Sequence, residues 1–331
     1  MGGNGKPLEI SVLIATRDRA RILEATLLAL RQQSLAGIGW EVIVIDNGSI
    51  DDTAAVLATF RRVLPLTVLH EPMPGKSRAL NRALEVAHGD LLVFTDDDVE
   101  PCSSWLDDLY KASCRWTAYS IFCGPIIPNY PSGMRPWLQR PPYAKWAYGR
   151  FDHALPEGPF PDQHLPFGAN FAVRASAMLE MRFSIQVGPN GNNYAMGCET
   201  ELLQRLVKRG GSIIYVPSAS VMHFIDESQA ELWWLYKRAF RLGRSLPHLI
   251  FETEEEVPLL FGVPRYKVRQ WLTALAQCAL SLFRGEERLF YWGTKLSKLL
   301  GELYEYCVIA SGSRQRVDSS SPDKLEKSVS P

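Results

Sequence analysis

Short apolar runs alternate with amphipathic stretches along the first third of the chain. The apolar runs predict four buried strands, at residues 9–15, 41–45, 66–69 and 91–94. After the first run, Leu23, Leu27 and Leu30 recur three and four positions apart, which is the spacing of one helix face. Strands that alternate with helices predict an α/β fold with a parallel, doubly wound sheet and right-handed crossovers.

Two further helices are predicted after the second and third strands. The first would bury Val56, Phe60 and Val63, and the second would bury an apolar face that begins at Leu80. Polar side chains that accept hydrogen bonds precede the helices, and we expect helix starts at Asp18, at Asp51 or Asp52, and at Ser77.

Polar residues follow each of the four strands, at Thr16, Asp46, Glu71 and Asp96. The carboxyl ends of parallel strands meet at one edge of a sheet, where α/β proteins bind their ligands. At this edge the fourth strand presents three consecutive carboxylates, Asp96 to Asp98. Oxygen ligands of this kind suit Mg²⁺ or Mn²⁺, which bridges carboxylates to substrate phosphates, whereas the alternative is a solvated acidic turn.

The rest of the chain changes in composition. Loops rich in proline and aromatic residues begin at residue 126, and regular structure is predicted again at residues 168–174, 199–209 and 212–216. A mostly helical segment and a tail rich in Ser, Asp and Lys follow, and we expect the tail to be disordered. The predicted segments are residues 9–125, 126–230, 231–310 and 311–331.

Charge and cysteine content narrow the classes of function. The 331 residues include 36 Lys plus Arg and 36 Asp plus Glu, so no long-range field attracts nucleic acid. The six cysteines show no paired short spacing, and no apolar segment follows Met1. This pattern argues against a zinc site and against a secreted, disulfide-bonded protein, so we expect a cytoplasmic one.

The sequence Gly-Lys-Ser at residues 75–77 follows a strand and precedes a helix, as in P-loop NTPases. A P-loop requires glycine where this chain has His70, and Pro72 and Pro74 have no backbone N–H to offer to a phosphate. A dinucleotide-binding fold is also disfavoured, because residues 15–19 contain no glycine.

Four motifs in order carry a family resemblance: Ser11–Asp18, Val44–Thr53, Pro74–Asn81 and Gly89–Asp98. Together they resemble family 2 glycosyltransferases over about residues 9–225. The resemblance implies a GT-A fold, the Rossmann-like doubly wound sheet of nucleotide-diphospho-sugar transferases, followed here by a C-terminal helical segment. It also implies a nucleotide-sugar donor bound by residues 9–125, an acceptor bound by residues 126–230, a divalent cation (Mn or Mg) and inversion at the anomeric carbon.

The resemblance assigns the donor nucleoside to the ends of the first two strands. Thr16, Asp46 and Asn47 match positions that hold the base and ribose, and their short polar side chains suit a uracil- or thymine-like edge. Many relatives have a second Asp where this chain has Asn47, so the base identity stays open. An Asx turn that ends the strand is the alternative for Asn47.

The resemblance assigns the donor phosphates and the metal to the next two motifs. Lys76 and Asn81 match the loop and helix that face the donor, where a Lys ammonium would offset phosphate charge. Asp96 and Asp98 form the Asp-x-Asp pair, which contacts the ribose and binds the metal. Asp97 could substitute for either acid.

Two further matches lie in the second half. Glu199 matches the acid that acts as the acceptor's general base, with Glu in place of the usual Asp. The alternative for Glu199 is favourable placement at a helix N-terminus, which Glu201 fits better. His223 matches a residue that completes the metal shell.

In the helical segment, the uncharged residues 270–283 are framed by Arg265, Lys267, Arg269 and Arg284. These 14 residues are shorter than the ~20 needed to cross a bilayer. A basic frame around an apolar body suits a helix that lies on an anionic membrane surface, and a core helix is the alternative.

The sequence therefore predicts an inverting glycosyltransferase that moves a sugar from a nucleoside-diphosphate donor to a hydroxyl acceptor in cell-surface polysaccharide or glycolipid synthesis. The expected partners are the nucleotide sugar, a carbohydrate or lipid-linked acceptor, and the inner face of the membrane. A P-loop-like NTPase and a catalytically inactive sugar-binding module are the alternatives.

Overall fold

The computed structural model describes residues 8–161, 164–191, 194–249, 258–260 and 262–319, and side chains up to residue 311. The chain divides into two compact units, Met1–Glu231 and Leu232–Pro331. The start of the chain lies outside the described residues, as does most of the predicted tail.

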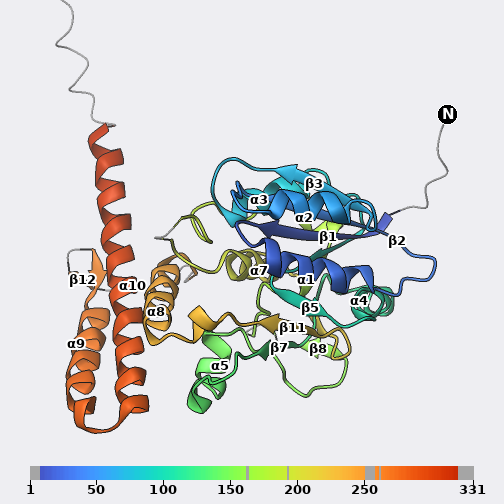
Figure 1. The fold of residues 1–331 in the computed structure, drawn as a ribbon. Helices are drawn as coiled ribbons and strands as arrows, with labels where there is room; N and C mark the ends of the chain where they lie inside the picture. Colours follow the sequence, from blue (N-terminus) through green and yellow to red (C-terminus); the bar gives the residue numbers. More distant parts are fainter. Residues whose placement is uncertain (1–7, 162–163, 192–193, 250–257, 261, 320–331) are drawn as a thin grey trace, which may run out of the picture. The chain divides into compact units, whose positions relative to one another are not determined.

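The first unit is built on an eight-stranded sheet of order β3-β2-β1-β4-β9-β6-β10-β8 (Figure 1). Its strands are β1 (Leu8–Thr16), β2 (Gly39–Asp46), β3 (Leu66–His70), β4 (Leu91–Phe94), β6 (Ile121–Cys123), β8 (Gly158–Phe160), β9 (Phe171–Arg174) and β10 (Ile213–Tyr215). Strand β1 pairs in parallel with β2 and β4, and β3 pairs in parallel with β2. The four predicted strands are therefore confirmed, and their carboxyl ends share one edge.

The sheet is not parallel throughout, contrary to the prediction. Strand β9 lies antiparallel between β4 and β6, and β8 lies antiparallel to β10. A buried strand shows the same apolar run whichever way it points. The long segment between β7 (Ile126–Asn129) and β9 allows the chain to re-enter the sheet from the opposite end.

Helices of the first unit connect and cover the strands. They are α1 (Ala20–Arg31), α2 (Thr53–Phe60), α3 (Lys76–Leu84), α4 (Trp105–Arg115), α5 (Tyr143–Trp146), α6 (Ala175–Met178), α7 (Cys198–Lys208) and the 3₁₀ helices η1 (Pro136–Gln139) and η2 (Glu227–Ala230). The predicted face Leu23, Leu27 and Leu30 is fully buried in α1. Helix α3 begins at Lys76, one residue before the predicted Ser77, and packs on β1 and β2.

The predicted helix start at Asp18 is wrong. Asp18 has a left-handed backbone (φ 51°), and its Oδ1 accepts a hydrogen bond from the Ile50 amide at 2.8 Å. The first helical amide, Ala20 N, donates instead to Asp51 Oδ2 at 2.9 Å. The two loops after β1 and β2 therefore hold each other across the sheet edge. Val63 lies beyond α2 and is 48% exposed, so it is not part of the buried face.

A second sheet of three strands brings distant segments together. It has the order β5-β11-β7, with β5 (Val99–Pro101), β7 (Ile126–Asn129) and β11 (Val221–Phe224). Strand β11 runs antiparallel to β5, so His223 pairs with Val99, and Phe224 N donates to Asp98 O at 2.9 Å. This pairing brings His223 beside the three aspartates.

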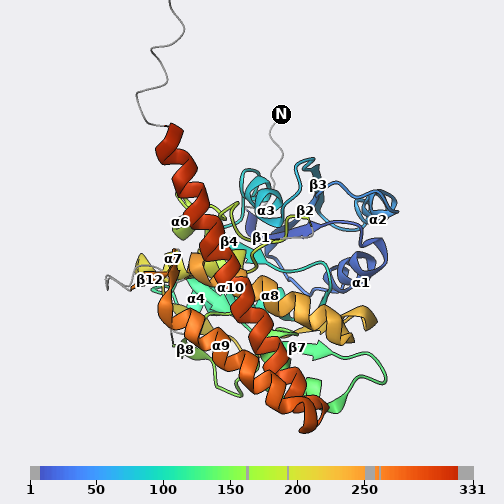
Figure 2. The same ribbon diagram turned by 90° about the vertical axis from the view of Figure 1, so that its left-hand side faces the viewer.

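The second unit is helical, as predicted, and consists of α8 (Leu232–Leu249), α9 (Arg265–Leu280), η3 (Ser281–Phe283), α10 (Glu286–Ser319) and the short strands β12 (Leu259–Leu260) and β13 (Val263–Pro264). Figure 2 shows α9 and α10 as a hairpin. Helix α10 continues past residue 311, where the sequence predicts a disordered tail. None of the helices in the described part of the chain is long and apolar enough to cross a membrane.

Helices α8 and α10 approach each other at glycines. A Cβ at Gly243 would lie 1.8 Å from Lys298 O, and one at Gly301 would lie 2.0 Å from Phe240 O. Next to this contact, Arg244 Nε donates to Glu305 Oε2 at 2.6 Å, and both residues are buried. The close backbone contact and the buried ion pair hold α8 on α10.

Candidate active site

The predicted edge of the first unit carries a buried cluster of charged side chains. Asp97 and Asp98, just after β4, are each only 5% exposed. Thr16, the last residue of β1, donates its Oγ1 proton to Asp97 Oδ2 at 2.7 Å. The parallel pairing of β1 with β4 brings these residues together, as the strand-end pattern predicts.

Arg19 joins two of the aspartates, and sequence reasoning missed it. Its Nη1 lies 2.8 Å from Asp97 Oδ1 and 2.8 Å from Asp98 Oδ2. Asp97, and to a smaller extent Asp98, raise the pKa of Arg19 and outweigh the opposite effect of burial. Burial in turn raises the pKa of Asp97. The positive charge of Arg19 therefore reduces the repulsion among the three adjacent carboxylates. Its position directly after the first strand-end motif was the available signal.

Asp98 also faces His223. Burial opposes ionisation of Asp98, but His223 and Arg19 outweigh it and hold the pKa of Asp98 well below its usual range. His223 Nε2 lies 3.5 Å from Asp98 Oδ1, and its Nδ1 is 3.0 Å from Tyr148 O. Tyr148 O therefore orients the ring so that Nε2 points to the acid.

One oxygen of this cluster accepts no hydrogen bond from the described residues. Asp98 Oδ1 is buried, and His223 Nε2, 3.5 Å away, pairs with it by charge but lacks hydrogen-bonding geometry. A buried carboxylate oxygen left unsatisfied costs free energy unless a cation binds there. Carboxylate oxygens and an imidazole nitrogen fit Mn²⁺ or Mg²⁺. Among the described residues, however, no three His, Cys, Asp or Glu side chains already converge as a metal site, because Arg19 and Lys76 pair with the acids.

Lys76 connects the aspartates to Glu199. It begins α3, and its Nζ forms ion pairs with Asp96 Oδ1 and, at 2.5 Å, with Glu199 Oε1. Burial would lower the pKa of Lys76, but Asp96 and Glu199 outweigh it and raise the pKa. Burial would likewise raise the pKa of Glu199, but the Lys76 ammonium outweighs it and lowers the pKa. Glu199 is thus held ionised beside the aspartates, at the start of α7.

The Glu199 carboxylate is oriented on its other side as well. The Cys198 thiol donates to Glu199 Oε2 at 3.1 Å, so each carboxylate oxygen has a different donor. Gly168 leaves the space that the side chain fills, because a Cβ at that position would lie 2.6 Å from Glu199 Cδ. Sequence reasoning missed both supports, because only the fold shows that the Cys198 thiol faces the Glu199 carboxylate and that Gly168 lies against it.

Glu201, the alternative acid, has a different environment. It lies one turn into α7 and accepts hydrogen bonds from Arg205 Nε at 2.6 Å and Arg205 Nη2 at 2.7 Å. This bidentate pair on one helix face has the geometry of a structural ion pair. The arrangement favours Glu199 over Glu201 as a base.

Asn47 and Asn81 bind backbone rather than the charged cluster. Asn47 Nδ2 donates to Glu71 O at 2.9 Å and Met73 O at 2.8 Å, and its Oδ1 accepts from Gly75 N at 2.7 Å. It therefore holds the loop that leads to Lys76. Asn81 exchanges two hydrogen bonds with the backbone of Phe183. Donor binding by either amide stays a prediction.

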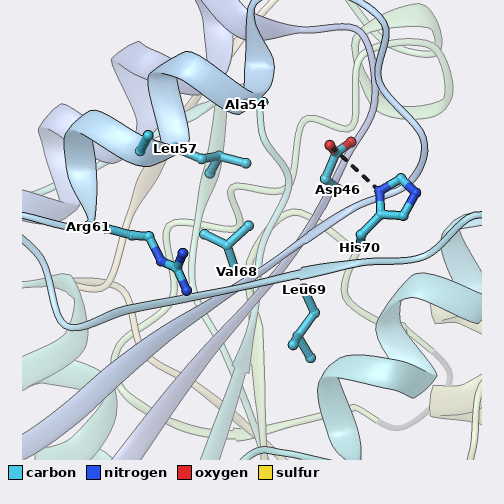
Figure 3. A pocket seen from close by; sticks show the side chains of 8 residues that line it. Asp46, Ala54, Leu57, Arg61, Val68, Leu69 and His70 are labelled. Carbon is cyan, nitrogen blue, oxygen red and sulfur yellow. Dashed lines mark ion pairs between the residues drawn. The ribbon is translucent and has the colours of Figure 1, made fainter.

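Asp46 lies at the end of β2 beside a pocket of about 190 Å³ between α2 and β3. Figure 3 shows its carboxylate facing His70, with 3.9 Å between Asp46 Oδ2 and His70 Nδ1. Leu57 and Val68 supply apolar walls. Asp46 Oδ1 accepts from the Ser49 amide at 2.9 Å.

Comparison with known proteins identifies the family. The chain matches the family model described as Glycosyl transferase family 2 over residues 11–181, which include Thr16, Lys76 and the three aspartates. It is 28% identical over 251 residues to the succinoglycan biosynthesis protein ExoM of Rhizobium meliloti, covering 74% of this chain and 76% of that protein. The chain belongs to glycosyltransferase family 2. Membership does not favour either alternative, an NTPase or an inactive sugar-binding module.

Solved structures agree on the fold. The mannosyltransferase PcManGT of Pyrobaculum calidifontis matches with a TM-score of 0.54 and 18% identity, over 95% of this chain and 90% of that one. TarS of S. aureus matches with a TM-score of 0.52 and 13% identity, over 93% of this chain and 92% of the other. The predicted GT-A fold with C-terminal helices is confirmed.

Proposed function

We propose that this glycosyltransferase inverts the anomeric carbon as it transfers a sugar from a nucleoside-diphosphate donor to a hydroxyl acceptor. One observation carries the proposal: Lys76 lies between Asp96 of the Asp-x-Asp pair and Glu199, the candidate base. The donor diphosphate and the acceptor hydroxyl would then meet at a single centre. Residues 9–125 would bind the donor and residues 126–230 the acceptor.

The proposed reaction is a single displacement. Glu199 accepts the proton of the acceptor hydroxyl while that oxygen forms its bond to the anomeric carbon. The bond from the anomeric carbon to the diphosphate oxygen breaks, and its electron pair leaves with the diphosphate. Attack on the face opposite the leaving group inverts the configuration. The ionised state of Glu199 beside Lys76 supports this role.

Lys76 would couple donor binding to the strength of the base. In the structure its ammonium pairs with Glu199, which lowers the pKa of that carboxylate and weakens it as a base. A donor diphosphate carries more charge than one carboxylate and would attract the same ammonium. The pKa of Glu199 would then rise towards its ordinary range, so the base gains strength when the donor is in place.

A divalent cation would fit beside Lys76, at the aspartates rather than at Glu199. Asp98, Asp96 and His223 would hold it, and the unsatisfied Asp98 Oδ1 supports this assignment. When bound, the cation would offset the charge of the leaving diphosphate. The neighbouring PcManGT was solved with GDP-Man and Mn²⁺, which is consistent with a metal here.

The donor nucleoside would bind at Thr16, Asp46 and Asn47, with Asp97 bound to Thr16 behind them. Neighbouring structures hold different donors, UDP-GlcNAc in TarS and GDP-Man in PcManGT, so the base is left open. The name of the ExoM relative supports a role in cell-surface polysaccharide synthesis. We propose a carbohydrate or lipid-linked acceptor, presented at the inner face of the membrane.

A thermal-shift screen over nucleotide sugars with Mn²⁺ tests donor binding. A donor at 100 times its dissociation constant adds about 2.7 kcal/mol to the free energy of unfolding. The melting temperature of the protein with that donor should therefore lie clearly above that of the protein alone. We expect one nucleotide sugar to stabilise the protein only when Mn²⁺ is present. Stabilisation by ATP and by none of the nucleotide sugars would contradict the proposal.

A further inference from the structure

Among the described residues of the second unit, helix α9 packs mainly on α10, and its other side is exposed. Within the second unit it contacts α10 and the short elements β13 and η3, and of its residues only Ala274 is fully buried. The open side is apolar over the C-terminal half of α9 and into η3. The exposed fractions of its large apolar residues are Leu272 55%, Leu275 43%, Leu280 55%, Leu282 62% and Phe283 94%. We call these five residues the α9 apolar face.

The charged residues within this stretch have one sign. No acidic residue occurs from Arg265 to Arg284, and the acids Glu286 and Glu287 follow only in the first turn of α10. Arg265 and Arg269 are exposed at the start of α9, and Arg284 is exposed just after Phe283. Lys267 differs from its neighbours, because its Nζ pairs with Glu302 at 2.6 Å and its side chain is 13% exposed. Of the four basic residues predicted to frame the apolar stretch, Lys267 is therefore engaged within the second unit, and the three arginines remain exposed.

The combination of exposed leucines and arginines favours one kind of binding partner for the α9 apolar face. A second copy of the chain would bring two sets of arginines together if two α9 faces met, which is unfavourable. An anionic surface complements the arginines, and lipid acyl chains complement the exposed leucines and Phe283. The 16 residues of α9 are about 24 Å long, less than the ~30 Å hydrocarbon core, so the helix suits the interface rather than a span.

We propose that the α9 apolar face is a binding surface for an anionic lipid bilayer. Helix α9 lies in the plane of the headgroups, and Leu282 and Phe283 in the turn before α10 enter the acyl boundary. Arg265, Arg269 and Arg284 contact lipid phosphates. This surface acts independently of the chemistry at Glu199, so loss of either function leaves the other measurable.

Flotation of the full-length chain with liposomes tests the surface. Vesicles of phosphatidylcholine with phosphatidylglycerol should carry the wild-type protein at low salt, and release it at high salt or without phosphatidylglycerol. The pair Arg265→Gln and Arg269→Gln should weaken binding by at least tenfold, since each basic residue near an anionic surface contributes about fivefold. The pair Leu282→Gln and Phe283→Gln should weaken binding at low salt, although neither change alters a charge.

Matched controls separate the surface from general effects. Leu179 is 77% exposed in the first unit, so Leu179→Gln tests loss of any exposed apolar residue, and Arg31→Gln tests loss of any exposed arginine. Both controls should bind like wild type, and circular dichroism should show every variant folded. Unchanged flotation of both α9 double variants would overturn the proposal. So would a wild-type protein that stays unbound but forms a dimer that Phe283→Gln disrupts, because the face would then join two copies.

Discussion

Glu199→Gln should lower the rate of sugar transfer by about 10² to 10⁴, because glutamine keeps the shape of the side chain but cannot accept the acceptor's proton. The lost negative charge also releases Lys76 from the ion pair at Glu199 Oε1. Donor affinity should therefore be unchanged or slightly tighter, while turnover falls. Steady-state kinetics together with calorimetric titration of the donor separate the two effects.

Glu201→Gln is the matched control for this experiment. Glu201 lies on the same helix but is bound to Arg205, so its replacement should reduce stability more than turnover. Transfer by Glu199→Gln at near the wild-type rate would remove Glu199 from the chemistry. A large loss of turnover in Glu201→Gln, with the fold intact, would assign the base to Glu201 instead.

Asp98→Asn should remove the dependence of donor binding on Mn²⁺. The change keeps the size of the side chain and leaves Arg19 paired with Asp97, so the fold should persist. It removes the negative charge at the unsatisfied Oδ1, where we place the cation. Loss of a residue that only hydrogen-bonds to a metal ligand typically lowers metal affinity by about 10- to 100-fold. Asp98 would be a ligand itself, so its replacement should lower metal affinity by roughly 100-fold or more.

Titration of nucleoside diphosphate with and without Mn²⁺ measures this effect. Asp90→Asn serves as the control, because Asp90 is exposed and immediately precedes β4 at the opposite end from the cluster. We expect Asp90→Asn to bind like wild type. An Asp98→Asn variant that keeps wild-type affinity and full metal dependence would show that the cation lies elsewhere.

The parts of the fold that follow from short-range pattern were predictable. Apolar runs located β1 to β4, and their alternation with helices predicted that Thr16, Asp46 and Asp96 would share one edge. Motif order then linked Glu199 and His223 to this edge across more than a hundred residues. The structure brings Glu199 beside Lys76, and His223 beside Asp98.

What pattern could not predict depends on partners distant in the sequence. The antiparallel direction of β9 leaves no trace in an apolar run, because burial on both faces looks the same in either direction. Arg19 gains its role only through the fold that brings it to Asp97 and Asp98. Asn47 has a suitable side chain for a nucleoside, yet its amide holds the loop before Lys76.

Release of nucleoside diphosphate from nucleotide sugars tests most directly whether the strand-edge cluster is a glycosyltransferase site. The full-length protein would be incubated with UDP-, GDP- and dTDP-sugars and Mn²⁺, with a chelator and with ATP as controls. We expect one nucleotide sugar to be cleaved, with the activity lost in chelator and reduced by about 10² to 10⁴ in Glu199→Gln. ATP should remain intact. Hydrolysis of ATP with every nucleotide sugar left intact would contradict this function.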